Sequence, residues 1–449
     1  MTEQALNDAV EAGDGETRSS RRRMRRVGFA SFTGTLIEFY DFNIYGVAAA
    51  LVFSKVFFPA LGTAAGTIAA FATLGVAFIA RPFGSILFGH FGDRLGRKKT
   101  LVSTLMLMGV ATVCVGLIPT TEKIGILAPI LLMLMRILQG LGAGGEWAGA
   151  VLFAAEHAPQ EKRGFWAMTP SLGAGFSVIL ANSTFLVTGL AMSEETFMDW
   201  GWRIPFLASG LLICVGLFIR LKIEETPVFK NQVSRSGPVR HPFIDALTSQ
   251  PREIFLAIGM ASVVPVLNYL ALAYLPNYGL TTLELTRTTI LFVGIAGGAS
   301  VAFGTLLGGV YADRLGRRRV ILTSTALAVV WVLLVFPFLG TGSIAAFLIA
   351  IIGTMVLGGI PYGAQSAYLT ELFHTRYRYS AAGFSYNIAT IIGGAIPPMI
   401  GAAITASFGV NYYGVFLAAI LVFSLVCTFA LGETRQKDLN DVGASPAVE

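Results

Sequence analysis

Residues 89–99 of the chain read GHFGDRLGRKK and residues 309–319 read GVYADRLGRRR, so one loop sequence occurs twice, 220 residues apart. A second pattern, a glutamate followed seven positions later by an arginine, also occurs twice, at Glu156/Arg163 and Glu371/Arg378. Two elements that recur in the same order at nearly one offset indicate a duplicated architecture with two equivalent halves.

The composition places the chain in a membrane. Of its 449 residues, 13% are charged (32 Lys and Arg, 26 Asp and Glu) and 54% are hydrophobic, whereas soluble domains carry about 25% charged residues. So few charges cannot cover the surface of a soluble protein, which excludes a soluble globular protein, a disordered chain and a disulfide scaffold. Cys114, Cys214 and Cys427 lie in apolar stretches, and we interpret them as small buried hydrophobic residues.

Twelve stretches are apolar and long enough to cross a bilayer, which takes about 20 residues. They span residues 28–54, 66–91, 101–119, 124–156, 165–191, 203–221, 253–278, 288–311, 320–340, 343–372, 380–406 and 411–432. The predicted fold is an all-α polytopic membrane protein with twelve transmembrane helices in two six-helix pseudo-symmetric halves.

The expected parts of the chain are a cytoplasmic N-terminal tail, a first six-helix bundle, a cytoplasmic linker, a second six-helix bundle and a cytoplasmic C-terminal tail. Their predicted limits are residues 1–26, 27–221, 222–252, 253–432 and 433–449. Residues 1–20 and 433–449 are polar and are expected to be disordered.

The distribution of basic residues predicts the orientation. With the N-terminus inside the cell, 26 of the 32 Lys and Arg residues, Arg220 among them, fall on cytoplasmic segments, as the positive-inside rule requires. Both termini are therefore expected to be cytoplasmic. The sequence pI of about 9.2 is then a consequence of topology and does not indicate nucleic-acid binding.

The repeated loop, Gly-x-x-x-Asp-Arg-x-Gly-Arg-Arg/Lys, resembles the signature of the major facilitator superfamily. More narrowly, the chain resembles the metabolite:proton symporter family over about residues 25–430. The matching segments are EFYDF (38–42), ARPFG (80–84), RILQG (136–140), GGEW (144–147), WRIP (202–205) and ETP (225–227). This resemblance implies proton-coupled uptake. The family is similar to α-ketoglutarate, citrate, shikimate and proline/betaine transporters, and the resemblance does not select among these substrates.

Five charged residues lie well inside the ends of predicted spans of the first half, at Glu38, Asp41, Arg81, Arg136 and Glu146. A charge in the hydrocarbon layer costs about 2.5–3.5 kcal/mol even on a lenient scale, so these residues are functional candidates. At about 1.5 Å per residue all five lie near the middle of the membrane. Because two neighbouring carboxylates in a low dielectric do not readily both ionise, we predict that Asp41, Glu38 and Glu146 couple transport to protons.

The two buried arginines can either neutralise these acids or hold a substrate carboxylate in bidentate fashion. The predicted substrate-binding set joins them to polar and aromatic residues of both halves. It consists of Arg81, Arg136, Gln139, Tyr45, Tyr274, Asn277, Tyr362 and Gln365. The alternative for each residue is an ion pair or interhelical contact that only fixes helix packing. Prolines at 265, 276, 361, 397 and 398 predict bends in spans seven, ten and eleven, which could serve gating or packing.

The repeated loops predict a latch between helices on the cytoplasmic side. In the superfamily, such loops resemble a latch that ties neighbouring helices together in the outward-open state. The expected members are Asp93, Arg94, Arg97, Glu156, Arg163, Asp313, Arg314, Arg317, Glu371 and Arg378. The alternative is that these charges only set topology.

Other motifs lead to no further chemistry. Gly140, Gly142, Gly144 and Gly145 lie within a span without a preceding strand, so we interpret them as a close helix contact and not as a dinucleotide loop. The sequence contains no phosphate-binding Gly-x-x-x-x-Gly-Lys-Ser/Thr loop, and its four histidines are dispersed, so neither ATP use nor a metal site is expected.

The sequence thus predicts a secondary transporter, and not an enzyme, for proton-coupled symport of a mono- or dicarboxylate by alternating access. The family resemblance implies that it lies in the bacterial inner membrane. Its expected partners are the substrate, protons and the lipid bilayer, without nucleic acid, ATP or a cofactor other than the coupling proton, and it is expected to be monomeric. The alternatives are a betaine/proline-type osmolyte carrier, a uniporter, or a drug/proton antiporter. The C-terminal tail is short and has no coiled-coil heptads, which disfavours the osmolyte carrier. A receptor or membrane enzyme would need a soluble domain or a catalytic constellation that the sequence lacks.

Overall fold

The computed structural model describes residues 3–222, 225, 241–437 and 439, and the regular elements of this part of the chain are all helices. The long helices of the first half are α1 (Glu3–Ala48), α3 (Gly62–Leu95), α4 (Arg97–Leu117), α6 (Leu127–His157), α8 (Thr169–Ala191) and α10 (Ile204–Leu221). The spans of the second half are built from α13 (Pro251–Ala261), α14 (Val263–Tyr269), α15 (Leu275–Thr281), α16 (Arg287–Leu315), α17 (Arg317–Leu339), α18 (Ile344–Leu372), α19 (Arg378–Thr390), α20 (Ile396–Phe408) and α21 (Val410–Ala430). Short helices connect them, namely α2 (Ser54–Val56), α5 (Thr121–Ile124), α7 (Arg163–Ala167), α9 (Glu194–Asp199) and α12 (Pro242–Ser249).

Within the described residues, ten helical segments are long and apolar enough to cross a membrane. Helix α1 and the interrupted α19–α20 segment account for the other two predicted spans. The predicted helical membrane fold is therefore confirmed.

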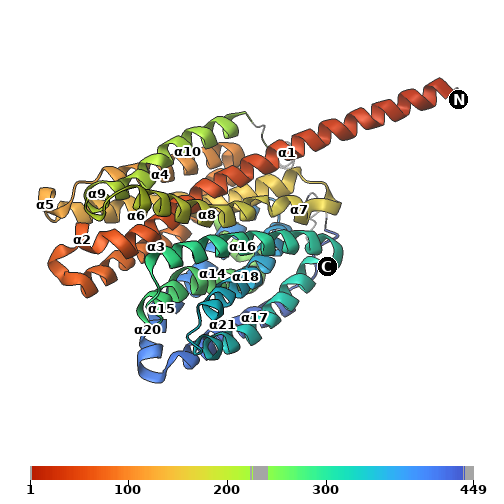
Figure 1. Cartoon of the computed structure of the whole chain (residues 1–449). Helices are drawn as coiled ribbons and strands as arrows, with labels where there is room; N and C mark the ends of the chain where they lie inside the picture. Colours follow the sequence, from red (N-terminus) through yellow and green to blue (C-terminus); the bar gives the residue numbers. More distant parts are fainter. Residues whose placement is uncertain (1–2, 223–224, 226–240, 438, 440–449) are drawn as a thin grey trace.

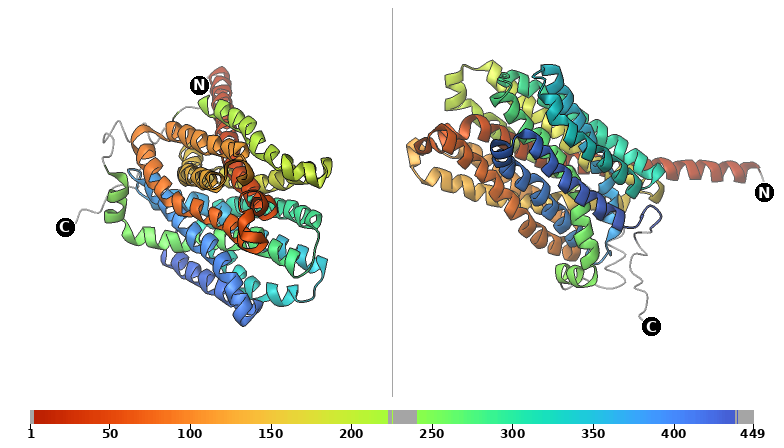
Figure 2. Two further views of the ribbon diagram at one scale, coloured as in Figure 1. Left: turned by 90° about the vertical axis from the view of Figure 1, so that its left-hand side faces the viewer. Right: turned by 90° about the horizontal axis from the view of Figure 1, so that it is seen from below.

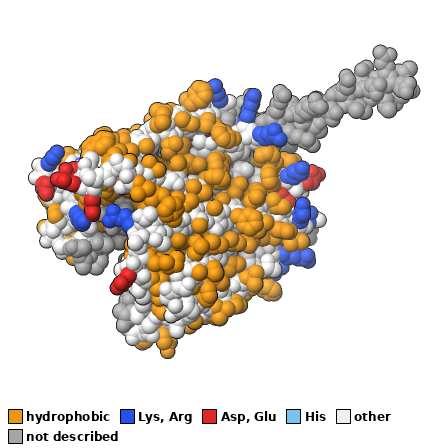
Figure 3. All heavy atoms as spheres, viewed as in Figure 1, with side chains coloured by type: hydrophobic (Ala, Val, Ile, Leu, Met, Phe, Trp, Pro, Cys, Tyr) orange, Lys and Arg blue, Asp and Glu red, His pale blue; other side chains and the backbone are white. Residues whose placement is uncertain are grey.

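The two halves lie side by side, with the first half above the second in Figure 1 and in the end-on view of Figure 2. They meet where α8 packs against α16 and α3 packs against α19. The two chain ends lie at one end of the bundle (Figure 1), and exposed Lys and Arg side chains gather there (Figure 3), so we call it the basic end. Apolar side chains cover the long side in view, and at the opposite end the molecule is hollowed between the halves (Figure 3).

The structure corrects the predictions for the chain ends. Helix α1 begins at Glu3, so the expected disorder of residues 1–20 is wrong for residues 3–20. The start of the C-terminal tail is also ordered, because Thr434 and Leu439 are buried and hydrogen-bonded to the second half. Helix α12 lies within the predicted linker, while linker residues 223–224 and 226–240 and tail residues 438 and 440–449 are outside the described part.

Two of the three spans with a predicted bend change helix type. Span seven contains the π-helical turn Leu270–Tyr274, which ends two residues before Pro276, and span eleven contains the π-helical turn Ile391–Ala395, which ends two residues before Pro397. Proline lacks an N–H group and its ring displaces the preceding carbonyl, which accounts for a local widening of the helix. Helix α18 instead continues through Pro361 as an α-helix.

Glycines bring neighbouring helices into backbone contact in both halves. A Cβ atom on Gly144 of α6 would overlap the carbonyl of Arg81 on α3, and one on Gly363 of α18 would overlap the carbonyl of Thr305 on α16. The interpretation of the glycines of span four as a close helix contact is thus confirmed, and this contact holds α3 and α6 in the positions that bury their charged side chains.

Candidate functional site

The first repeated loop joins the two halves at the basic end. Asp93, at the end of α3, accepts hydrogen bonds from the backbone N–H groups of Tyr379 (3.3 Å) and Ser380 (3.1 Å) and from the Ser380 hydroxyl (2.9 Å). Its carboxylate also pairs with Arg97 (3.1 Å), whose Nη2 lies 3.5 Å from Glu156. Asp93 thus binds the N-terminus of α19, where a negative charge is favourable.

The second loop repeats this arrangement in the opposite direction. Asp313, at the end of α16, accepts hydrogen bonds from the N–H groups of Gly164 and Phe165, both at 2.8 Å. Arg317 pairs with Asp313 (3.2 Å) and with Glu371 (3.1 Å). Each half therefore donates backbone N–H groups to the aspartate of the other half, as the internal repeat requires.

Two further ion pairs tie the copies together. Arg378 lies 3.6 Å from Glu156, and Arg163 lies 3.1 Å from Glu371, so each glutamate contacts an arginine of both halves. We call the contacts of Asp93, Asp313 and these two glutamates the basic-end gate.

The structure does not bring two of the predicted latch residues into these contacts. Arg94 and Arg314 are exposed, and Arg94 donates instead to His90 (3.1 Å).

Next to the gate, two glutamates that were not in the predicted latch bind the N-termini of helices. Glu225 accepts hydrogen bonds from the N–H groups at the start of α4, and Glu433 accepts those of Arg317 (3.0 Å) and Arg318 (3.1 Å) at the start of α17. A Glu-Thr dipeptide occurs at 225–226 and again at 433–434. This repeat was the signal that could have identified them.

Aromatic and small polar residues extend the contact between the halves toward the middle of the molecule. Trp147 of α6 stacks on Tyr386 of α19 (centroids 3.7 Å apart) and lies 6.3 Å from the ring of Tyr362 on α18. The hydroxyl oxygens of Ser171 on α8 and Ser366 on α18 are 2.9 Å apart. The molecule is therefore closed at the basic end and hollowed at the other (Figure 3).

Asp41 lies in a buried chain of polar groups in the first half. Its carboxylate accepts hydrogen bonds from Ser209 and from Thr112 (2.6 Å). Gln139 donates to the Thr112 hydroxyl (2.6 Å) and accepts from Arg136 (2.8 Å). Asp41 and Arg136 are thus linked through two neutral side chains rather than by direct contact.

The two predicted substrate-binding arginines share one aromatic ring. The Arg81 guanidinium lies 4.0 Å and that of Arg136 lies 4.9 Å from the ring centroid of Phe42, and Arg136 also lies 3.7 Å from the ring of Tyr45. Both arginines are at least 98% buried. Nε of Arg81, and Nε and Nη2 of Arg136, have no hydrogen-bond partner among the described residues. Two buried cations with free donors form a site that an anion would complete.

The acids Glu38 and Glu146 have different surroundings. Glu146 forms a buried ion pair with Arg220 and accepts a hydrogen bond from Thr104 (2.7 Å). Arg220 was assigned to the cytoplasmic charges, but α10 turns it inward, where the absence of a side chain at Gly34 leaves space for its guanidinium. Glu38 is 1% exposed, and its Oε2 has no hydrogen-bond partner among the described residues.

The predicted residues of the second half do not form one group. Tyr362 and Gln365 are buried on α18, and the Gln365 amide has no hydrogen-bond partner in the described part of the chain. Tyr274 instead packs against Tyr413 and shares a hydrogen bond with Thr405, and Asn277 is exposed. Tyr269, which was not in the predicted set, contacts the Phe78 ring of the first half (5.2 Å).

Two similar helical halves that close at one end and open at the other, around buried charges, define a membrane transporter. The chain belongs to the Major Facilitator Superfamily, whose sequence profile matches residues 31–388 and 298–447.

Relatives and solved structures agree with this assignment. The chain is 40% identical to the inner membrane metabolite transport protein YhjE of Escherichia coli K12 over 92% of this chain and 95% of that protein. It is 37% identical to the E. coli K12 shikimate transporter (90% and 94% covered) and 31% identical to the proline/betaine transporter of the same organism (95% and 86% covered). The E. coli proton:xylose symporter XylE superposes with a TM-score of 0.78 at 18% identity, over 94% of this chain and 99% of that structure, and so shares the fold. The chain is thus a multi-pass transporter of the plasma membrane.

Proposed function

We propose that the chain is a proton-coupled symporter of a small carboxylate. The observation that carries this proposal is the pair of guanidinium groups of Arg81 and Arg136 on the Phe42 ring, buried and with unpartnered N–H donors. A carboxylate presents four acceptor sites in a plane and matches a guanidinium in bidentate fashion. Such a substrate would satisfy donors that the protein itself leaves free.

The balance of buried charge supports coupling to a proton. Three buried cations and three buried anions lie in the middle of the first half, at Arg81, Arg136, Arg220, Glu38, Asp41 and Glu146. With all six ionised the site is neutral, so a bound carboxylate would add an uncompensated negative charge. One added proton removes that excess. Proton and carboxylate therefore favour each other's binding, and this coupling is reciprocal.

We assign the coupling proton to Asp41. Glu146 is already partnered by a cation, because it pairs with Arg220. Asp41 contacts only hydroxyl groups among the described residues, at Ser209 and Thr112. A hydroxyl can donate to the ionised carboxylate and accept from the protonated one, so both states can be hydrogen-bonded.

We place the basic end in the cytoplasm, in accordance with the positive-inside rule. The gate is then closed toward the cytoplasm, and the hollow between the halves faces outward (Figure 3). Substrate and proton would bind from outside, and opening of the gate would release them inside.

The named relatives include a shikimate transporter, whose substrate is a carboxylate, and a proline/betaine transporter, whose substrates are zwitterions. A zwitterion carrier is the second candidate, because the Trp147, Tyr362 and Tyr386 rings could face an onium group. In this structure Trp147 and Tyr386 stack at 3.7 Å, so the space between those two rings is filled. This contact favours the carboxylate.

Uptake into proteoliposomes tests the proposal. Labelled shikimate, α-ketoglutarate, proline and glycine betaine are supplied outside, with and without an imposed inward proton gradient. We expect a carboxylate to accumulate only with the gradient, and Asp41→Asn to abolish accumulation. A carboxylate taken up equally without a gradient would indicate a uniporter, and uptake of betaine alone would favour the second candidate.

A further inference from the structure

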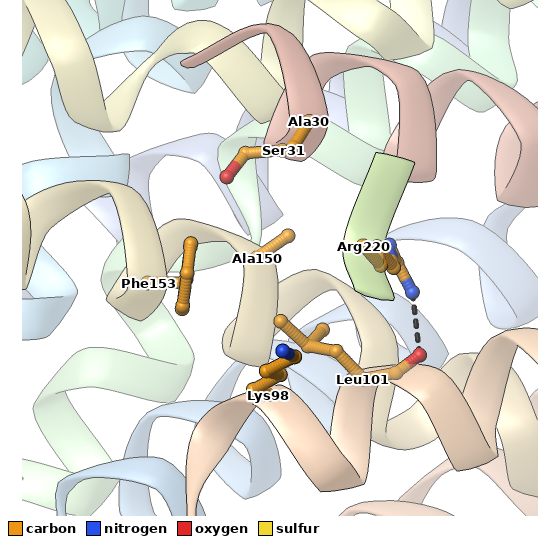
Figure 4. A pocket seen from close by; sticks show the side chains of 7 residues that line it. All are labelled: Ala30, Ser31, Lys98, Leu101, Ala150, Phe153 and Arg220. Carbon is orange, nitrogen blue, oxygen red and sulfur yellow. Dashed lines mark hydrogen bonds between the residues drawn. The ribbon is translucent and has the colours of Figure 1, made fainter. Parts of the chain in front are cut away.

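A small pocket of about 20 Å³, enough for a water molecule, lies in the first half near the basic end (Figure 4). Residues of four helices line it, namely Ala30, Ser31, Lys98, Leu101, Ala150, Phe153 and Arg220. It lies among α1, α4, α6 and α10 and is separate from the contact between the halves.

A buried hydroxyl without a partner faces this pocket. Ser31 is 4% exposed, and its Oγ has no hydrogen-bond partner among the described residues. Figure 4 shows its side chain projecting from α1 toward Ala150 and Phe153. By contrast, Thr33 on the same helix donates to the Phe29 carbonyl (2.7 Å). A buried unsatisfied hydroxyl is unfavourable unless water or a ligand reaches it.

The same face of α1 carries two more such oxygens. Thr35 and Glu38 follow Ser31 at four and seven residues, which places all three on one side of the helix. Thr35 Oγ1 and Glu38 Oε2 are buried and likewise lack a partner in the described part of the chain. Successive members are about 6 Å and 4.5 Å apart along the helix axis. One water molecule between neighbours would connect them.

Charged groups surround the inner end of this row. Glu38 lies within electrostatic range of Arg81 on α3, of Glu146 on α6, of Arg220 on α10 and of Asp41 one turn further along α1. Arg220 also lines the pocket and pairs with Glu146. The three oxygens therefore lead from the pocket to the Glu38 carboxyl group. Arg81 and Arg220 can stabilise the negative charge of this group.

We propose that Ser31 and Thr35 form a proton route from Glu38 to the cytoplasm through the interior of the first half, separate from the substrate path between the halves. The proposal rests on the proposed proton coupling. Asp41 passes the coupling proton to the Glu38 carboxylate, which lies one turn back along α1. Glu38 then gives up the proton and is again a carboxylate, Thr35 and Ser31 accept and donate it in turn through bridging water, and water in the pocket takes it away. Substrate and proton then leave by different paths.

Cysteine accessibility tests the water connection without any substrate. In a chain whose three native cysteines are replaced, a Ser171→Cys/Ser366→Cys disulfide holds the gate closed, since the two hydroxyl oxygens are 2.9 Å apart. Ser31→Cys is then treated in inside-out vesicles with a small membrane-impermeant thiosulfonate. We expect it to react at least tenfold faster than Ile37→Cys, whose parent side chain packs against Leu105 and Ile213. Equal rates would overturn the route.

Transport by Thr35→Val tests the proton step itself. We expect gradient-driven uptake to fall at least tenfold while substrate exchange at equal pH, which needs no net proton release, stays at the wild-type rate. Thr35→Ser should restore uptake. Wild-type uptake that ignores the gradient would refute the proposed function, whereas driven wild-type uptake that Thr35→Val leaves unchanged would refute only the route.

Discussion

Replacing Asp93 with asparagine should open the basic-end gate. Three hydrogen bonds from the second half reach this carboxylate, two from backbone N–H groups and one from the Ser380 hydroxyl, and all three break when the halves separate. A hydrogen bond to a charged acceptor contributes about 1.5–3 kcal/mol and one to a neutral acceptor about 0.5–1.5 kcal/mol. Asp93→Asn thus removes about 1 kcal/mol per bond, or about 3 kcal/mol from the closed state.

Because about 1.4 kcal/mol corresponds to a factor of ten, this loss shifts the ratio of closed to open molecules roughly a hundredfold. The assay is pulsed electron paramagnetic resonance with spin labels at Lys99 and Arg376, both exposed at the basic end on different halves. The distance between the two labels is longer when the gate is open, and we expect this longer distance to become dominant in Asp93→Asn. Arg94→Gln is the matched control, since this neighbour is exposed and outside the gate contacts. An unchanged distance distribution in Asp93→Asn would refute the gate.

Three further variants test separate parts of the structure. Arg81→Lys keeps the positive charge but loses the planar guanidinium that can bind a carboxylate through two hydrogen bonds. The apparent KM for the carboxylate in proteoliposome uptake should therefore rise about tenfold or more. An unchanged KM would show that Arg81 does not bind the substrate. Gly144→Ala should lower the unfolding temperature because its Cβ meets the Arg81 carbonyl, at about 1–3 kcal/mol, whereas Gly75→Ala has open space and should not. Glu433→Gln should destabilise the protein by about 1 kcal/mol, seen in thermal unfolding, because it weakens the cap of α17, and it should leave the KM unchanged; wild-type stability would show that the cap is dispensable.

The repeated sequence predicted much of the gate because both copies place the same side chains at the same helix ends. Asp93 and Asp313 contact the opposite half, and Glu156 and Glu371 pair with Arg97 and Arg317 of the repeated loops. A motif that fixes helix ends in two halves also fixes which groups meet between them.

Side-chain direction within the spans could not be predicted in the same way. Counting basic residues assigned Arg220 to the cytoplasmic surface, whereas it faces Glu146 inside the bundle. Tyr274 faces Tyr413, and Asn277 is exposed. Membrane helices are apolar on every side, so their sequence does not reveal which face a polar residue occupies. That depends on packing, for example on the space that Gly34 leaves for Arg220.

The proton-to-substrate flux ratio tests the central proposal most directly. Lightly buffered proteoliposomes with an external pH dye receive the transported carboxylate at equal pH on both sides, and carboxylate entry and external alkalinisation are recorded together. We predict one proton per monocarboxylate for the wild type and, in Asp41→Asn, carboxylate exchange with no accompanying proton movement. Wild-type carboxylate entry without alkalinisation would contradict proton-coupled symport.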